Sequence, residues 1–365
     1  MPYSLDSVDT PFVAMDLDVV ERNLQAMQAR IDALGLKLRP HTKTHKQPWL
    51  AARQMAIGAH GLTVAKLGEA EVMLEAGFNE LLIAYPLVGE AKAVRLAALM
   101  ARGLKPVVAI DSREALETLA RAAAIVDQPI RVLIEVDTGF HRCGLRGPAV
   151  IELARAVRQA PRLLFAGLMS YSGHISGQGD PAKIQQIIRE EDEILWQHAQ
   201  DLQACGVPVE IISIGGTVLA HYLASPTHAT EVRPGIYVFN DLGIVHSGAC
   251  RLDDCAARVW STVVSRPAPD RAILDAGSKM LAFDGPIEGS YGYVVDYPGW
   301  HIRRLSEEHA IVEIDAGAPR PDIGQRVAVI PNHICPVINL QDRVVGVRAG
   351  QVVSTHAILG RGLTR

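Results

Sequence analysis

The chain has 365 residues, of which 48% are hydrophobic and 21% are charged, and its formal net charge at neutral pH is -4. This length predicts one large α/β domain of roughly 200 to 250 residues and a second, smaller domain. The charge balance excludes the basic surface that nucleic-acid binding requires, so we expect no nucleic-acid partner.

The N-terminus and the cysteines predict a cytoplasmic protein. The first ten residues lack the basic and apolar regions of a signal peptide, and no apolar run reaches the ~20 residues of a membrane span. The five cysteines are odd in number and include no C-x-x-C motif, which is typical of reduced thiols. We therefore expect no membrane partner.

Short apolar runs alternate with longer amphipathic runs from Pro11 to about Asp241, which is the pattern of repeated β-α units and a parallel sheet. The first of eight predicted strands covers Leu36 to Pro40. The other seven lie near Gly61–Ala65, Glu80–Tyr85, Pro106–Ile110, Arg131–Val136, Leu163–Met169, Glu210–Ile214 and Glu231–Val238. Helices are predicted at Asp18–Ala33, Gln47–Ile57, Leu67–Ala76, Glu90–Met100, Ser112–Val126, Ala149–Gln159 and Pro181–Ala204. Eight such units favour a (β/α)8 TIM barrel, with a doubly wound open sheet as the alternative.

The pattern changes after about Val245, where short β-branched segments are separated by Gly, Pro and Asp turns. This texture predicts an antiparallel β domain. Its strands are expected at Ala257–Val264, Ala272–Asp275, Tyr291–Val295, Ala310–Ile314, Arg326–Ile330, Arg343–Arg348 and Gln351–His356. We therefore predict a barrel in residues 10–245 and a β domain in residues 246–365, with residues 1–15 as a candidate to pack on the β domain.

The segment P-H-T-K-T-H-K, from Pro40 to Lys46, places Lys43 at the junction between the first barrel strand and the next helix. A lysine at this junction would lie at the mouth of the barrel. Its cationic neighbours Lys37, Arg39 and Lys46 would lower the pKa of the amine, as a Schiff-base lysine requires. The alternative is a solvated basic loop or an anion-binding patch.

Other barrel strands also end in polar motifs, and the active site of such a barrel lies at these carboxyl ends. After the seventh strand, Gly215, Gly216 and Thr217 form a turn whose amides can hold a phosphate, or a tight β-α turn that needs glycine for its geometry alone. His174, in a glycine-rich loop, is a candidate general base or an exposed side chain.

Two arginines and two tyrosines lie at the same strand ends. Arg142 and Arg233 can contact a phenolate or carboxylate, although a structural ion pair is the alternative for each. Tyr171 and Tyr237 are candidates for the same cavity or for the core, where their hydroxyls would be satisfied.

The β domain contains I-P-N-H-I-C-P, from Ile330 to Pro336. On an extended segment, His333 and Cys335 would point to one side, and imidazole with thiolate suits Zn²⁺ or a related divalent ion. Two protein ligands leave positions for water and substrate, as catalytic metals need. An ordinary strand end with a buried thiol is the alternative.

Together these motifs resemble the fold-type III pyridoxal phosphate enzymes related to the alanine racemase N-terminal domain, and among them the D-threonine aldolase and D-serine dehydratase branch. The motifs that carry the resemblance are P-H-T-K-T-H-K, V-D-T-G-F-H-R-C-G, I-G-G-T, R-P-G-I-Y-V-F-N-D, D-A-G-S-K, L-S-E-E-H and P-N-H-I-C. They run nearly from one end of the chain to the other.

The resemblance implies a role for each candidate residue. Lys43 would carry pyridoxal 5'-phosphate as a Schiff base, Arg142 would lie near its phenolic oxygen and Tyr171 near its ring. The phosphate would be bound by Gly215, Gly216, Thr217 and Tyr237. His333 and Cys335 would hold a divalent metal close to the cofactor, with Mn²⁺ or Zn²⁺ favoured and Mg²⁺ as a further candidate. A homodimer is also implied.

Two reactions of a β-hydroxy-D-amino acid then compete. If His174 or a metal-bound water removes the hydroxyl proton, the Cα–Cβ bond breaks, and D-threonine gives glycine plus an aldehyde. If Lys43 removes the α-proton and the metal carries off hydroxide, D-serine or D-threo-3-hydroxyaspartate gives an oxo acid and ammonia. We favour the aldolase, with the dehydratase as its rival. A non-catalytic pyridoxal phosphate-binding protein and an amino-acid racemase are weaker alternatives.

Overall fold

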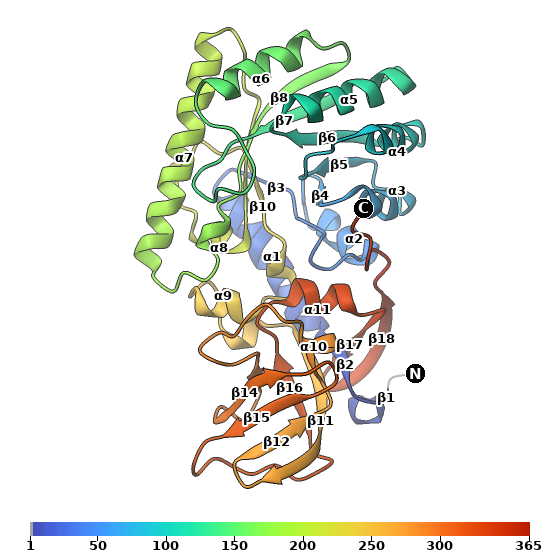
Figure 1. Cartoon of the computed structure of the whole chain (residues 1–365), viewed down its shortest axis with the longest axis vertical. Coiled ribbons are helices and arrows are strands. Elements are labelled where there is room, and N and C mark those ends of the chain that lie inside the picture. Colours follow the sequence, from blue (N-terminus) through green and yellow to red (C-terminus); the bar gives the residue numbers. More distant parts are fainter. Residues whose placement is uncertain (1–2) are drawn as a thin grey trace. The chain divides into compact units, whose positions relative to one another are not determined.

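The protein is described by a computed structural model that covers residues 3–365 and divides into two compact units (Figure 1). The barrel unit comprises Met27–Lys43, Pro48–Gly235 and Leu363–Arg365. The β unit comprises the chain up to Ala26, then Thr44–Gln47 and Ile236–Gly362. Each unit is described by itself.

The barrel unit contains an eight-stranded parallel sheet whose strands follow the order β3-β10-β9-β8-β7-β6-β5-β4. The strands are β3 (Lys37–Leu38), β4 (Leu62–Val64), β5 (Glu80–Ile83), β6 (Lys105–Ile110), β7 (Ile130–Glu135), β8 (Leu163–Met169), β9 (Ile211–Gly215) and β10 (Glu231–Arg233). A parallel bridge between His41 and Thr63 joins the two ends of this order. The amide of Thr42 donates to the carbonyl of Thr63 at 2.8 Å, and the amide of Thr63 donates to the carbonyl of Pro40 at 2.8 Å. The sheet therefore closes into the predicted barrel, and the open-sheet alternative is wrong.

Helices alternate with these strands and lie outside the sheet, as the labels α3 to α7 show in Figure 1. They are α2 (Pro48–Ala56), α3 (Leu67–Glu75), α4 (Glu90–Ala101), α5 (Arg113–Val126), α6 (Pro148–Gln159), α7 (Pro181–Ala204) and α8 (Thr217–Tyr222). Helix α1 (Leu17–Ala33) runs from the β unit into the barrel unit. Buried side chains from five of these strands, β5 to β9, form one hydrophobic cluster of Leu82, Val107, Ala109, Leu133, Ala166, Met169 and Ile211. The helices and most strands agree with the sequence prediction to within one or two residues.

The eighth barrel strand is shorter than predicted. Strand β10 stops at Arg233, and the rest of the expected strand is a 3-10 helix, η3 (Ile236–Val238). Pro234 and Gly235 separate the two. Proline has no amide hydrogen to donate to a ladder, so the apolar run I-Y-V-F beyond it cannot continue the parallel pairing.

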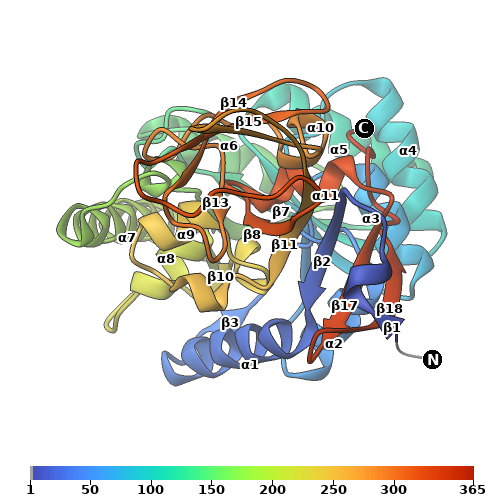
Figure 2. The same cartoon turned by 90° about the horizontal axis from the view of Figure 1, so that it is seen from below.

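The β unit contains a ten-stranded sheet in the order β1-β18-β17-β2-β11-β12-β15-β14-β13-β16. Its strands are β1 (Tyr3–Ser4), β2 (Phe12–Asp16), β11 (Ala257–Ala268), β12 (Arg271–Leu274), β13 (Tyr293–Val294), β14 (Trp300–Leu305), β15 (Ala310–Ile314), β16 (Arg326–Ile330), β17 (Arg343–Arg348) and β18 (Gln351–Ala357). Strand β2 lies between β11 and β17, as Figure 2 shows, and pairs antiparallel with β11 but parallel with β17. The N-terminal strand is thus part of this sheet, which is otherwise antiparallel as predicted.

Several short helices complete the β unit, and none of them was predicted. They are α9 (Leu242–His246), α10 (Ser278–Leu281), α11 (Ile334–Leu340), and the 3-10 helices η1 (Leu5–Ser7) and η4 (Leu252–Asp254). Strand β14 was also missed, although Trp300 and Ile302 alternate with more exposed side chains on it. All five cysteines are free thiols. Within residues 3–365, no helix has both the length and the apolar character required to cross a membrane.

Candidate active site

Lys43 lies in a turn that follows the His41 bridge at the carboxyl end of β3, as predicted. The side chain is half-buried, and its Nζ atom lies 5.6 Å from the centroid of the Tyr171 ring. The backbone amide of Lys43 donates to Nδ1 of His41 at 3.4 Å. The turn therefore brings an amine and an aromatic ring together at the barrel mouth, which suits a flat, aldehyde-bearing cofactor.

The cationic neighbours predicted for Lys43 have other partners. Arg39 forms a buried ion pair with Glu231 at 2.8 Å inside the barrel. Lys46, in the β unit, lies 3.4 Å from the carbonyl oxygen of Gly360. Two of the basic side chains in this segment therefore make structural contacts. The alternative of a solvated basic loop is wrong, because the segment is mostly buried, at His41, Thr44, His45 and Lys46.

Arg142 and Tyr171 meet at the same mouth. The guanidinium carbon of Arg142 lies 4.7 Å from the Tyr171 ring centroid, and Nη2 lies 3.9 Å from a carboxylate oxygen of Glu135. The loop that carries Arg142 is held by Asp137, whose carboxylate accepts from the amides of Gly139 and His141, each at 3.0 Å. Burial raises the pKa of Asp137, but these bonds and the nearby cations outweigh burial and lower the pKa to about 2.

The glycine turn after β9 lies close to a buried cation, and its predicted role in phosphate binding stays a prediction. A Cβ atom on Gly215 would lie 2.8 Å from the guanidinium of Arg233, and Gly216 has φ +119. Arg233 is buried and donates to the hydroxyl of Ser213 at 2.5 Å and to the carbonyl of Ser170 at 2.6 Å. Glycine is thus required at position 215, because the guanidinium of Arg233 occupies the space that a side chain would need. Thr217 begins α8 and is buried.

His174 lies in the 3-10 helix η2 (Gly173–Ile175) and packs against Phe140, with ring centroids 6.3 Å apart. Its Nδ1 atom is buried and has no hydrogen-bond partner among the described residues. Burial, the largest effect, lowers the pKa of the imidazole. His174 is therefore neutral at physiological pH and has an unpaired nitrogen, which suits a general base.

In the β unit, His333 and Cys335 are joined by a side-chain hydrogen bond. The predicted extended geometry is wrong, because His333 is the extended N-cap residue of α11 and Cys335 lies in its first turn. Pro336 favours this helix start, since a first-turn residue needs no intrahelical amide bond. The sulfur of Cys335 lies 3.2 Å from the hydroxyl oxygen of Thr44, and Nδ1 of His333 is hydrogen-bonded to the carboxylate of Asp284.

This donor pair fits a divalent metal. Burial lowers the pKa of His333, but the hydrogen bond to Cys335, the charge of Cys335 and the carboxylates of Asp241 and Asp284 raise it to about 9. An imidazole beside a thiol in such an anionic setting favours a bound cation, and these two ligand types suit Zn²⁺. Across residues 3–365, no group of three or more His, Cys, Asp and Glu side chains is arranged to hold a metal. The role of His333 and Cys335 as two metal ligands stays a prediction.

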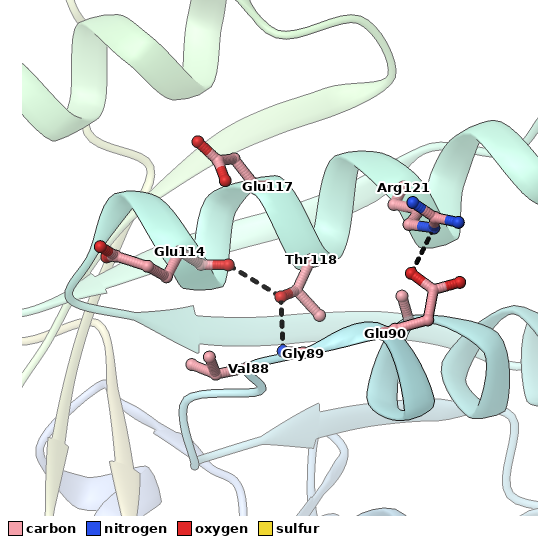
Figure 3. Close-up of a pocket in the computed structure, with 8 residues that line it drawn as sticks. Val88, Gly89, Glu90, Glu114, Glu117, Thr118 and Arg121 are labelled. Atoms are coloured by element: carbon pink, nitrogen blue, oxygen red, sulfur yellow. Dashed lines mark hydrogen bonds and ion pairs between the residues drawn. The ribbon is translucent and has the colours of Figure 1, made fainter.

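Tyr237 is assigned to the β unit and is almost fully buried within η3. Its predicted role in phosphate binding remains a prediction. A separate surface cavity of about 450 Å³ lies between α4 and α5 and is lined by Val88, Gly89, Glu90, Ala93, Glu114, Glu117, Thr118 and Arg121 (Figure 3). None of the predicted site residues lines this cavity, whose walls are joined by an ion pair between Arg121 and Glu90 at 2.5 Å.

Sequence reasoning missed four residues that shape the site: Thr44, Glu135, Asp241 and Asp284. Glu135 ends β7 inside the barrel, where burial raises the pKa of its carboxyl. Thr44 and Asp241 carried a sequence signal, because they lie within the lysine motif and the R-P-G-I-Y-V-F-N-D motif, whereas Glu135 and Asp284 lie outside every quoted motif. Asp284 could not have been found from spacing, since 48 intervening residues separate it from His333.

Comparison with known proteins decides the family. The model of the alanine racemase N-terminal domain matches residues 15–242, which is more than half of the chain. The chain belongs to this family. The model of a putative serine dehydratase domain matches residues 256–347 of the same chain. The family assignment confirms the predicted fold type III pyridoxal phosphate-dependent enzyme.

Two characterised proteins are similar to this chain over almost their whole length. A D-threonine aldolase of an Arthrobacter species is 36% identical over 99% of this chain and 95% of its own. A D-threo-3-hydroxyaspartate dehydratase of Delftia sp. strain HT23 is 33% identical over 92% of this chain and 93% of its own. Both are lyases, so the predicted enzyme class is confirmed.

Solved structures of family members agree with this assignment. The D-threonine aldolase from Filomicrobium marinum superposes with a TM-score of 0.91 and 33% identity, covering 100% of this chain and 99% of that one. Alanine racemase from Bacillus anthracis, at 14% identity and a TM-score of 0.68, shares the fold.

Proposed function

We propose that the chain catalyses the retro-aldol cleavage of β-hydroxy-D-amino acids, with D-threonine giving glycine and acetaldehyde. Lys43 would bind pyridoxal phosphate, and His333 with Cys335 would bind a divalent metal. The observation that carries the proposal is the two-donor pair of His333 and Cys335, because such a metal keeps positions open for a substrate hydroxyl. The Arthrobacter D-threonine aldolase supports the choice of reaction.

The residues of the barrel unit would bind and orient the cofactor. The amine of Lys43 and the guanidinium of Arg142 lie 5.6 and 4.7 Å from the Tyr171 ring centroid, so both face one ring-sized region. We assign the phosphate to the amides of Gly215, Gly216 and Thr217. This assignment rests on the amides of the turn and not on a helix dipole, because α8 has only 6 residues. Bound pyridoxal phosphate supplies an electron sink for the bond that breaks at Cα.

His174 would take the proton of the substrate's β-hydroxyl group. Its neutral imidazole, buried Nδ1 atom and position after β8 suit this role. A metal at His333 and Cys335 would supply a Lewis acid. Removing this proton leads to cleavage of the Cα–Cβ bond, while the α-proton stays in place.

The dehydratase is the second candidate, and a specific observation favours it. Solved structures of D-threo-3-hydroxyaspartate dehydratase include a histidine-to-alanine mutant and a cysteine-to-alanine mutant in a metal-free form. This chain presents the same two residue types as a hydrogen-bonded pair. In a dehydratase, Lys43 would remove the α-proton, and the metal would assist loss of the hydroxyl group.

Product analysis separates the two reactions. Purified protein with pyridoxal phosphate and either Mn²⁺ or Zn²⁺ is given D-threonine and D-serine in parallel. Glycine and acetaldehyde from D-threonine would support the aldolase. Ammonia and pyruvate from D-serine, without glycine from D-threonine, would replace it by the dehydratase. The native metal and the homodimer remain predictions, which metal analysis and the molar mass in solution can test.

A further inference from the structure

The imidazole of His333 is held by a carboxylate from a different loop. Asp284 lies in the loop after helix α10, and its Oδ2 atom is hydrogen-bonded to Nδ1 of His333. The side chains of His333 and Asp284 are 40% and 44% exposed, respectively. The pair is therefore accessible from solvent, and its attraction alone would add little to stability.

A buried amide fixes the backbones that carry this pair. Asn332 precedes His333, and its Nδ2 donates to the carbonyls of Gly285 and Ser290, both at 2.9 Å. Gly285 is the residue after Asp284. Asn332 is only 7% exposed, so these two bonds are shielded from water. The contact between Asp284 and His333 is therefore built into the loop geometry.

A second carboxylate nearby has a different task. Asp241 is buried, and its oxygens accept from the backbone amides of Ile334 at 3.0 Å and Ile244 at 3.1 Å. It thus anchors the first turn of α11. Asp284 is the carboxylate that is hydrogen-bonded to the ring itself.

This arrangement determines which ring nitrogen is available. An imidazole that donates through Nδ1 to a carboxylate keeps the lone pair of its neutral form on Nε2. A carboxylate behind a metal-binding histidine fixes the orientation of the ring and strengthens it as a donor. We propose that Asp284 is a positioning residue of the metal centre, which holds Nδ1–H of His333 and presents Nε2 to the metal. This inference rests on the metal site of the proposed function.

A titration of the pyridoxal phosphate-loaded protein with Co²⁺ tests the proposal. Difference spectra give both the affinity and the thiolate-to-cobalt absorption of Cys335. Asp284→Ala should weaken Co²⁺ binding by about 10- to 100-fold, while the thiolate absorption persists at saturation. Asp284→Asn should recover much of the affinity, because its amide oxygen still accepts from Nδ1–H. An unchanged Co²⁺ affinity in Asp284→Ala would overturn the proposal. An equal loss of affinity in Asp284→Asn and Asp284→Ala would also overturn it, because it would indicate that Asp284 binds the metal directly.

Two further variants separate this inference from the proposed function. Glu288→Gln changes another exposed carboxylate of the same loop, which lies 3.6 Å from His246, and should bind Co²⁺ like the wild type. His333→Ala should lose most of the affinity. If His333→Ala binds Co²⁺ as tightly as the wild type, the metal site itself is wrong. If only Asp284→Ala does so, the metal site stands and the positioning role is wrong.

Discussion

The hydroxyl oxygen of Thr44 lies 3.2 Å from the sulfur of Cys335, and Thr44 directly follows Lys43 in the chain. Thr44 is fully buried, so its hydroxyl makes this contact without competition from bulk water. One residue therefore connects the proposed cofactor lysine, through a peptide bond, with a proposed metal ligand, through a side-chain contact.

Thr44→Val should weaken metal binding while the protein stays folded. Valine has nearly the same shape but cannot donate a hydrogen bond to the thiolate of a metal-bound Cys335. Losing one such bond to a charged group corresponds to about a tenfold change in affinity. Zn²⁺ affinity measured against a competing chelator checks this expectation. Thr44→Ser, which keeps the hydroxyl, serves as the control, and equal affinities in Val and Ser variants would show that the contact is unimportant.

Lys43→Ala should abolish the long-wavelength absorption of the lysine-bound cofactor and lower turnover of D-threonine by about a thousandfold or more, because the covalent link is lost. Absorption spectra and initial rates provide the measurement. Lys37→Ala is the matched control, since Lys37 is an exposed lysine on the strand that leads to Lys43. A lysine-bound absorption that persists in Lys43→Ala would assign the link to another lysine.

His174→Asn should retain the cofactor absorption and lose about 100- to 10,000-fold in kcat, the usual contribution of a general base. Its residual rate should also lose the acidic limb of the pH profile that protonation of His174 imposes. His60 is a suitable comparison, because burial lowers its pKa as well, but it precedes β4 at the amino end of the strand. Equal losses in His60→Asn and His174→Asn would argue against a base at position 174.

Much of the fold was predictable because its local signals agree with its packing. Helix α7 (Pro181–Ala204) was predicted to the residue, since Pro181 begins it and Asp180 caps it. Strand β10 was overextended because the apolar run I-Y-V-F looks like a strand, whereas Pro234 ends the ladder. Strand β14 was missed because two adjacent arginines, Arg303 and Arg304, obscure the alternation of Trp300 and Ile302.

The candidate site divides in the same way. Lys43, Arg142 and Tyr171 were predicted from motifs at strand ends, and parallel strands bring such ends together. The contact between Asp284 and His333 depends on the hydrogen bond from Asn332 to the carbonyl of Gly285. No periodicity or motif in the sequence predicts this bond. The pairing of His333 with Cys335 was predicted, but from an extended geometry where the chain forms a helix start.

The buried carboxyl of Glu191 predicts a pH-dependent stability. Burial, the largest effect, raises its pKa from 4.5 to about 7, and Ser170 donates to one oxygen at 2.5 Å. Because the folded-state pKa is raised, the stabilising protonated form is complete below pH 4.5 and is lost as pH rises through 7. The difference between 4.5 and about 7 corresponds to the order of 3 kcal/mol.

Glu191→Gln removes this titration, because the amide stays neutral at every pH. The free energy of unfolding of the wild type should therefore fall relative to the variant between pH 4.5 and 7. Denaturant unfolding of both proteins at pH 5 and pH 8 provides the measurement. Parallel pH dependences of the two proteins would show that Glu191 does not bind a proton more tightly in the folded state.

The fate of the α-hydrogen tests the central claim most directly. Retro-aldol cleavage breaks Cα–Cβ and leaves the α-hydrogen on the product, whereas dehydration begins with its removal. The holoenzyme, loaded with metal, is given D-threonine that carries deuterium at Cα, and products are analysed in the initial phase by mass spectrometry. The account predicts glycine that retains one deuterium, with kcat/KM close to that of the unlabelled substrate. Release of the deuterium to water together with ammonia and an oxo acid, at a rate slowed by the label, would contradict it.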